Sequence, residues 1–219
     1  MVGEETRMSS AREEILARIR QACPTSTEDA TASYVLVTRQ YQQIAKLGRK
    51  DILDLFAERL HEYDAHVYRT GETGVATLCG ELFERRSAKR IVVPKDLPAE
   101  WQSGAEFVPD DDLDARSLDR FDGVMTAATL AIAETGTIVL QDAEAQGRRV
   151  ISLIPDYHLC VVREQDVVET VVEGMRLLET THHLPTTLFS GPSATADIEM
   201  TRIKGVHGPR FVDVVILEG

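Results

Sequence analysis

The chain has 219 residues, with 36 Asp and Glu against 24 Lys and Arg, and a formal net charge of −12. Hydrophobic residues make up 43% and charged residues 27%, the profile of a folded globular protein rather than a disordered one. The acidic balance argues against nucleic acid and anionic membranes as partners, because both are bound through Lys and Arg.

The three cysteines, Cys23, Cys79 and Cys160, are too few and too scattered for a disulfide framework or for a zinc or iron–sulfur motif. The sequence therefore predicts no metal and no cofactor bound by this chain. Glu4 and Glu5 stand where a signal peptide has basic residues, and no apolar run approaches the ~20 residues of a membrane helix. We expect a cytoplasmic protein without membrane insertion.

The first part of the chain predicts a separate helix. Ser10 and Glu13 have the spacing of a capping box, and Pro24 ends the predicted helix. The stretch from Pro24 to Ser33 has the composition of a linker. We therefore expect residues 1–33 to form a helix and linker, outside a single domain of residues 34–219.

Helices alternate with strands in the next part of the chain. Apolar residues recur at helical spacing over residues 51–60 and 75–83, and short apolar runs at 91–93 and 106–108 predict buried strands. This alternation is typical of an α/β fold with a parallel sheet. The acidic stretch 110–122 lacks the spacing of a calcium loop, which favours a solvated loop and helix start over a cation site.

The second half of the chain predicts strands around one helix. The helix is expected from about residue 166 to 179, with Val171 and Met175 among its inward residues. Two strands are expected at 131–133 and 137–140, joined at a glycine. Two more are expected at 150–154 and 159–162, on either side of a turn at 155–158. The last two are expected at 186–189 and 211–217.

The segment at residues 190–199, SGPSATADIE, is the most informative candidate site. Pro192 after Ser-Gly predicts the first turn of a helix, whose free N–H groups suit a carboxylate or phosphate. An ordinary capped helix explains the same pattern equally well. The ligand-binding candidates here are Ser190, Gly191, Ser193, Thr195 and Asp197.

A second candidate site surrounds Glu134, which interrupts an apolar strand pattern. A carboxylate at the end of a central strand suits a general base, a nucleophile or a ligand hook. Gly136 permits a bend or a close approach by a ligand, and Thr135 and Thr137 supply hydroxyl groups. A glutamate that points to solvent at a hairpin is the alternative. We favour function because ligands gather at strand ends in α/β sheets.

The third candidate is KGVHGPR at residues 204–210. Gly205 and Gly208 bracket His207, a side chain type that exchanges protons near neutral pH and is, with Glu134, a catalytic candidate. Arg210 can bind an acid through two parallel hydrogen bonds, although a plain turn with a surface arginine fits as well. For His158, a ligand-binding role and a structural role in a turn are equally open.

The order AETGT, IPDYH, SGPSATADIE and GVHGPR closely resembles the lactate-utilisation (LUD) domain family, and in particular its short members. The resemblance covers about residues 35–219. Longer relatives in the same pathway carry cysteine-rich cluster motifs that this chain lacks. The resemblance implies a three-layer α/β/α sandwich similar to the NagB/RpiA/CoA-transferase-like folds, here with an extra N-terminal helix.

The resemblance also implies a subunit of a system that oxidises L-lactate to pyruvate, with iron–sulfur clusters in partner subunits and a small anionic ligand on this chain. Two alternatives stay open. CoA transferases of the same fold group use a glutamate beside a glycine as nucleophile, so Glu134 would make the chain an independent enzyme of acyl, CoA or phosphosugar chemistry. A non-catalytic assembly or regulatory module would instead hold partners through its N-terminal helix and acidic surface.

Overall fold

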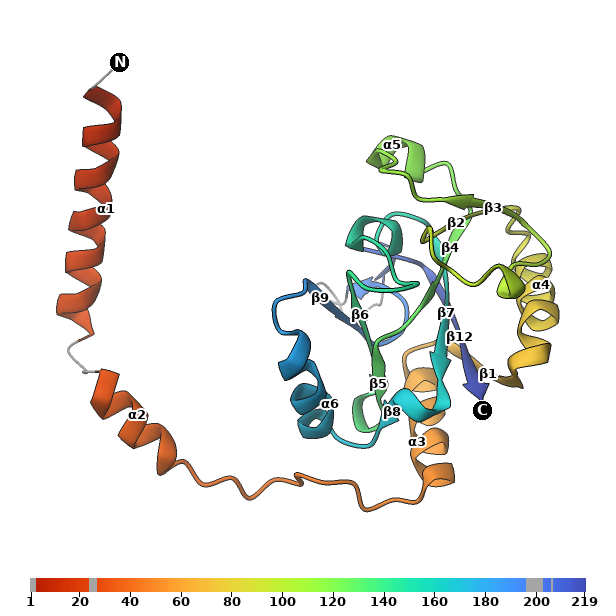
Figure 1. The fold of residues 1–219 in the computed structure, drawn as a ribbon, viewed down its shortest axis with the longest axis horizontal. Helices are drawn as coiled ribbons and strands as arrows, with labels where there is room; N and C mark the ends of the chain where they lie inside the picture. The colour runs from red at the N-terminus through yellow and green to blue at the C-terminus, as the bar shows by residue number, and fades with distance from the viewer. Residues whose placement is uncertain (1–2, 24–26, 196–202, 206) are drawn as a thin grey trace. The chain divides into compact units, whose positions relative to one another are not determined.

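The computed structural model describes residues 3–23, 27–195, 203–205 and 207–219. The chain divides into two compact units, Met1–Tyr41 and Gln42–Gly219. The first unit contains α1 (Gly3–Ala22) and α2 (Thr27–Val35) (Figure 1).

Both helices of the first unit differ from the prediction. α1 begins at Gly3, before the predicted cap at Ser10, so the capping-box spacing does not mark the start of this helix. α2 occupies most of the stretch expected to be a linker. Its sequence, TEDATASYV, contains neither Gly nor Pro, the two residues that most strongly disfavour a helix.

The second unit carries four α-helices, six short 3-10 helices and twelve strands among its described residues. The helices are α3 (Arg49–Glu62), α4 (Val75–Arg86), α5 (Ala115–Leu118), α6 (Val171–Leu178), η1 (Glu72–Gly74), η2 (Ala99–Trp101), η3 (Ala133–Thr135), η4 (Arg149–Ser152), η5 (Glu164–Asp166) and η6 (Glu179–Thr181). The strands are β1 (His66–Gly71), β2 (Arg90–Val93), β3 (Glu106–Pro109), β4 (Gly123–Ala127), β5 (Leu130–Ile132), β6 (Thr137–Gln141), β7 (Tyr157–Arg163), β8 (Val167–Val168), β9 (Thr186–Phe189), β10 (Ala194–Thr195), β11 (Ile203–Lys204) and β12 (Phe211–Glu218).

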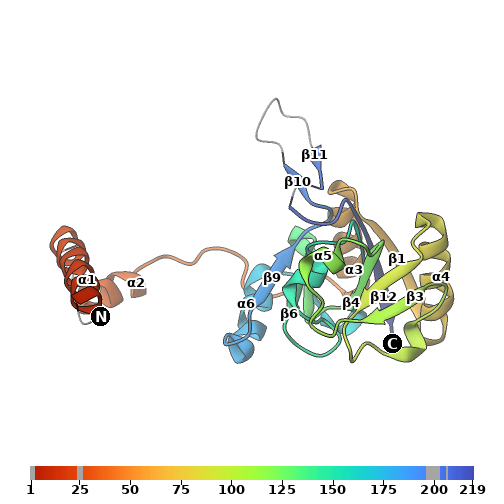
Figure 2. The same ribbon diagram turned by 90° about the horizontal axis from the view of Figure 1, so that it is seen from above.

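The central sheet has six strands in the order β1-β12-β7-β4-β2-β3, and every neighbouring pair in it is parallel. A second sheet, in the order β8-β5-β6-β9, is antiparallel except for its β5–β8 pair. β10 and β11 form a small antiparallel ribbon beside the body (Figure 2). The α/β class with a parallel sheet is confirmed, and the narrower likeness to the CoA-transferase group stays a prediction.

Two hydrophobic layers cover the central sheet. On one face, Cys79 and Phe83 of α4 pack against β2, β4, β7 and β12. On the other face, Phe56 of α3 and Ile138 of β6 belong to one buried cluster with β7 and β12, so the second sheet and α3 share that layer. α6 covers the outer side of the second sheet through Leu178 (Figure 1). The predicted helices at 51–60 and 75–83 are confirmed. The two strands expected on either side of Gly136 are present and pair as a hairpin.

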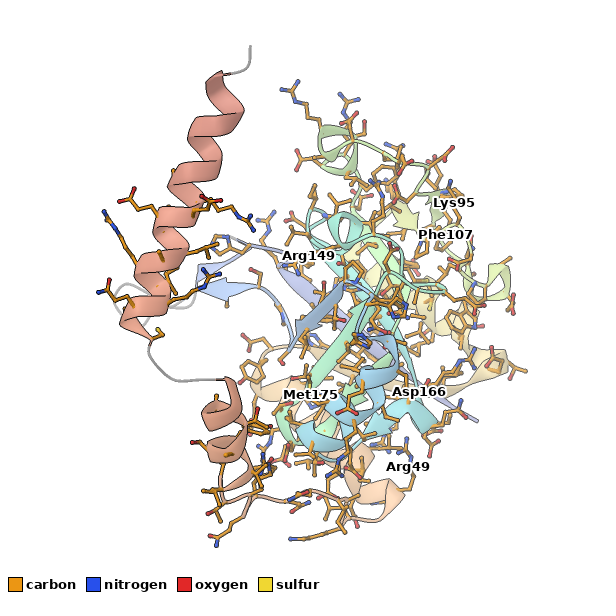
Figure 3. All side chains as sticks on the ribbon, turned by 60° about the vertical axis from the view of Figure 1, so that its left-hand side comes forward. Arg49, Lys95, Phe107, Arg149, Asp166 and Met175 are labelled. Atoms are coloured by element: carbon orange, nitrogen blue, oxygen red, sulfur yellow. The ribbon has the colours of Figure 1, made fainter. Side chains whose placement is uncertain are left out.

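Four predictions for the second half are wrong in detail. The predicted helix at 166–179 is shorter, because Thr170 and Glu173 form a capping box that starts α6 at Val171. Val171 and Met175, both expected inside, are 38% and 51% exposed. Figure 3 labels Met175. The predicted strand at 150–154 overlaps the short helix η4, and the predicted turn at 155–158 includes the first residues of β7.

The helix predicted to begin at Pro192 is absent from the described residues 190–195. The chain bends there and continues into β10, which pairs with β11 across the following segment. Ser-Gly-Pro suits a bend as well as a helix start, and the β10–β11 pairing depends on residues ten positions away that local spacing does not reveal. None of the helices in the described part of the chain is long and apolar enough to span a bilayer.

Candidate functional site

A cavity of about 300 Å³ opens at the amino-terminal ends of β7 and β12. His158 and Val212 line it, each the second residue of its strand, and the two are paired across the parallel ladder. Alternate residues of a strand point to opposite faces of the sheet. His158 and Val212 share their parity with Cys160 and Val214, which pack toward α3 and the second sheet. The cavity therefore lies on the second-sheet side of the central sheet.

The cavity gathers residues from segments that are far apart in the sequence. Phe189 comes from the end of β9, His158 from β7, and the turn before β12 supplies His207 and Gly208. Of the residues singled out in the sequence, the cavity is lined by His158, Ser190, Gly191, Ser193, His207 and Gly208.

Arg149, in the helix η4, also lines the cavity and was missed in the sequence analysis. Figure 3 shows it on the body, far from Arg49. Its guanidinium donates one hydrogen bond, from Nη1 to Thr187 Oγ1 at 3.1 Å, and forms no ion pair within the described part of the chain. The signal in the sequence is the pair of adjacent arginines after Gly147.

The neighbouring Arg148, in contrast, uses its hydrogen-bond donors on partners within the chain. Its Nε and Nη2 bind the two oxygens of the buried Asp110 at 2.7 and 2.6 Å, and Nη2 also donates to Leu113 O. The acidic stretch therefore contributes a structural ion pair rather than only a solvated loop. Arg148 uses its donors on Asp110 and Leu113 O, whereas Arg149 makes one hydrogen bond, to Thr187 Oγ1, so Arg149 keeps most of its donors for a ligand.

The described lining of the cavity contains no carboxylate. Its polar side chains are Arg149, His158, His207 and the hydroxyls of Ser152, Thr187, Ser190 and Ser193. An anion in this cavity would meet one permanent positive charge and several hydrogen-bond donors, with no like charge among these residues.

His158 is buried and neutral. Burial lowers the pKa of His158 to about 4, so at neutral pH its ring carries no charge. Thr126 Oγ1 and His158 Nε2 share a hydrogen bond of 2.8 Å. The ring lies against Phe189, with 5.2 Å between the ring centroids. His158 therefore supplies an aromatic wall rather than a positive charge.

Ser193 and His207 are hydrogen-bonded to each other on the rim of the cavity. The N–H of His207 donates to Ser193 Oγ at 3.1 Å, which leaves the hydroxyl proton of Ser193 available to a ligand. Ser193 N donates to Pro209 O at 2.8 Å. Gly191 has φ +82°, and a Cβ there would lie 2.8 Å from Tyr63 Cβ, so glycine is required for the bend that brings Ser193 to the rim.

Glu134 does not line the cavity. Its Oε1 accepts the N–H of Val171 at 2.6 Å, at the start of α6, and its own N–H donates to Glu169 O. Gly136 lies against α3, where a Cβ would be 2.9 Å from Arg59 Cβ, so this glycine permits helix packing. The Glu134 turn is thus engaged in holding α6 and α3.

Thr135 and Thr137 connect the Glu134 turn to the cavity rim. Thr135 Oγ1 and Thr137 Oγ1 share a hydrogen bond of 2.8 Å, and Thr137 Oγ1 and Ser190 Oγ share one of 2.9 Å. The hydroxyl of Ser190, which lines the cavity, is therefore positioned by residues behind it.

The remaining predicted ligand residues lie elsewhere. Arg210 binds Asp156 through Nε at 2.9 Å and through Nη2, and Gly205 N donates to Ser193 O at 3.0 Å, so both hold the turn before β12 without lining the cavity. Thr195 belongs to β10, and its side chain lies outside the described part. Asp197 lies outside the described residues altogether.

A second hollow of about 230 Å³ lies at the carboxyl-terminal ends of β7 and β12, the edge where α/β sheets usually bind ligands. Its charges neutralise each other. Arg49 Nε lies 3.5 Å from Glu164 Oε1, and Arg163 Nη1 lies 4.0 Å from Glu72 Oε2. The amino-end cavity is therefore the better anion site.

The described residues contain no cluster of three or more His, Cys, Asp or Glu side chains that could hold a metal ion. Cys79 and Cys160 are buried, and burial raises the pKa of each thiol to about 12. Thiols of this kind stay protonated at neutral pH, whereas a metal binds the thiolate.

Fold and cavity together define an α/β protein with a small pocket whose described lining holds one arginine, without an ion pair, and no carboxylate. A family model described as the LUD domain matches residues 11–217, so the chain belongs to the LUD domain family. The match begins well before residue 35 and includes most of α1.

Individual relatives agree with the family match. A protein of Deinococcus radiodurans named lactate utilization protein C is 39% identical, over 95% of this chain and 96% of the relative. A protein of the same name from Bacillus subtilis is 24% identical, over 78% of this chain and 80% of the relative. A crystal structure of a DUF162 family protein from Deinococcus radiodurans superposes with a TM-score of 0.68 at 34% identity, covering 80% of this chain and 100% of that one.

Proposed function

We propose that this chain acts in lactate utilisation, as a subunit of a system that oxidises L-lactate to pyruvate and that binds a small anionic ligand in the amino-end cavity. The observation that carries the proposal is Arg149, which has no ion pair in the described part of the chain, in a cavity lined also by residues 190–193 and 207–209. The names of the relatives supply the pathway.

The cavity residues divide the work of binding an anion. The guanidinium of Arg149 supplies the charge and a planar fork of donors that matches a carboxylate. Ser193 adds a hydroxyl donor and His207 an imidazole on the rim. With a net charge of −12 the chain repels anions at long range, so these local donors must supply the affinity.

Electron transfer is assigned to partner subunits. Lactate oxidation releases two electrons, and three scattered cysteines, two of them buried as protonated thiols, do not suit the four-cysteine ligand set of a cluster. Iron–sulfur clusters in partner subunits would accept the electrons, and this chain would bind and orient the anion.

The alternative of an independent enzyme requires the carboxylate of Glu134 to reach a substrate. That carboxylate accepts the N–H of Val171 and does not line the cavity. The geometry therefore favours the binding subunit.

Reconstitution tests the proposal. The chain is expressed together with its candidate iron–sulfur partners, and lactate-dependent reduction of an electron acceptor is measured with and without it. We expect the chain to co-purify with the partners and its omission to abolish reduction. An unchanged rate of reduction in its absence would refute the proposal.

A further inference from the structure

The cavity is larger than its simplest candidate ligand. Its volume is about 300 Å³, enough for several water molecules. Lactate is a three-carbon acid and would leave much of this space filled with water. A volume of ~300 Å³ is instead at the lower end of the range for pockets that enclose drug-sized ligands.

The described lining of the cavity combines a charged group with apolar side chains. Arg149, Ser152 and Thr187 are among its polar residues. Leu153, Phe189 and Val212 line the cavity as well and provide carbon surface. The Phe189 ring packs against the neutral ring of His158, with 5.2 Å between the ring centroids and an interplanar angle of 33°. Such a surface suits the face of a ring or an apolar chain.

The charge of the described lining matches a single negative charge. Arg149 is its one permanent cation, because His158 is neutral and no lysine or second arginine lines the cavity among these residues. A carboxylate carries one negative charge, whereas a phosphate monoester carries nearly two at neutral pH. One guanidinium therefore favours a carboxylate.

From these observations we infer that the cavity binds a carboxylate larger than lactate, whose anionic group meets Arg149 and whose apolar or aromatic body lies on Phe189. The inference rests on the proposed function, because it concerns the same cavity. It makes Arg149 and Phe189 the residues that determine specificity, one for the charge and the other for the body.

Calorimetric titration of the full chain tests the inference with three probes. L-Lactate and L-3-phenyllactate share the same head group and differ by a phenyl ring, and 3-phenylpropane-1,2-diol keeps the ring without the charge. We expect phenyllactate to bind at least tenfold more tightly than lactate, and the diol to bind at least tenfold more weakly than phenyllactate.

Three variants locate the two contacts. Arg149→Gln should weaken phenyllactate binding at least tenfold, whereas Arg116→Gln, the same charge change on an exposed arginine outside the lining, should leave it unchanged. Phe189→Ala should reduce phenyllactate to the affinity of lactate. If a variant fails to fold, the comparison of the three probes on the unmodified chain still tests the inference.

Each contrary outcome is informative. Equal affinity for lactate and phenyllactate, or binding of neither, would overturn the inference. So would phenyllactate binding that the diol reproduces or that Arg149→Gln leaves intact. If phenyllactate does not bind while lactate-dependent reduction still requires the chain, only this inference is refuted. If phenyllactate binds through Arg149 while reduction proceeds without the chain, the proposed function falls and the inference stands.

Discussion

The amino-terminal ends of β7 and β12 carry different chemistry on the two faces of the central sheet. Toward α4, the buried Asp213, only 1% exposed, accepts hydrogen bonds from Arg86 Nη2 at 2.7 Å and from Tyr157 Oη at 3.0 Å. Toward the second sheet, one residue along each strand, His158 and Val212 line a cavity.

The two faces differ in how their charges are satisfied. On the α4 face the charged groups have partners within the chain, and burial together with the Asp213 carboxylate raises the pKa of Tyr157, so its phenol stays protonated and donates. On the cavity face, Arg149 has a hydroxyl partner and, among the described residues, no carboxylate partner. We therefore expect variants on the α4 face to change stability and variants on the cavity face to change binding.

The largest expected effect lies on the α4 face. Arg86→Ala removes the arginine that binds the buried Asp213 and leaves that carboxylate with only Tyr157 Oη and the exposed His66 ring, which should lower the free energy of unfolding by about 3 kcal/mol. Arg85→Ala, in which the lost partner is the hydroxyl of Tyr68, should cost less than about 1 kcal/mol. Urea denaturation measures both, and equal losses would contradict the distinction between the faces.

The second effect is a pH dependence of the stability, caused by His158 on the cavity face. The pKa of His158 falls from 6.5 to about 4 on burial, so below about pH 6.5 the unfolded chain takes up a proton that the folded chain refuses. His158 therefore contributes stability that is complete above pH 6.5 and is lost as the pH falls toward 4. The loss is about 3 kcal/mol, at ~1.36 kcal/mol for each pH unit.

His158→Gln isolates this contribution. The amide keeps a polar partner for Thr126 and does not titrate. Denaturation of both proteins between pH 7 and pH 4 should show a shallower fall for the variant. Parallel curves would mean that His158 does not carry the pH dependence.

A smaller effect is expected at the Glu134 turn. Glu134→Ala removes the acceptor for the Val171 N–H and should lower stability by about 1 kcal/mol, as loss of a helix cap does. Glu134→Gln keeps an acceptor oxygen and should lose less. If Glu134→Gln instead folds normally and abolishes lactate-dependent reduction, the carboxylate is catalytic. That result would support the alternative of an independent enzyme.

The smallest effect concerns the first unit. The buried hydrophobic residues of the described chain run from Ile52 to Leu217, so deletion of residues 1–41 should leave the Tm of the body nearly unchanged. Deletion of residues 1–47 is the control, because it also removes Gln42 and the N–H of Leu47, both of which bind the buried Glu169. Only the longer deletion should lower the Tm.

The sequence predicted those helices and strands whose apolar residues recur at helix or strand spacing and are buried in the core. The stripe of Phe56 and Leu60 in α3, the hairpin through Gly136 and the strand β12 all appear as predicted. Helix ends were less certain: α6 starts at its capping box, and the segment after Pro192 pairs as a ribbon with distant residues.

The site was predicted in part, for a physical reason. Ser193 and His207 sit in recognisable glycine turns, and the structure brings both to one cavity. Arg149 was missed because the sequence does not show which of two adjacent arginines has a carboxylate partner. That depends on Asp110, 38 residues from Arg148, and only the fold brings these two together. Whether the predicted residues bind a ligand stays a prediction.

The most direct measurement compares Arg149→Gln with Arg116→Gln in the reconstituted system, with lactate-dependent reduction as the readout. A charge-assisted hydrogen bond contributes about 1.5–3 kcal/mol, or roughly 10- to 100-fold in binding. Arg149→Gln should therefore lower the rate at limiting substrate at least tenfold with no change in stability, while Arg116→Gln keeps the full rate. Equal rates for both variants would contradict the assignment of the amino-end cavity as the functional site.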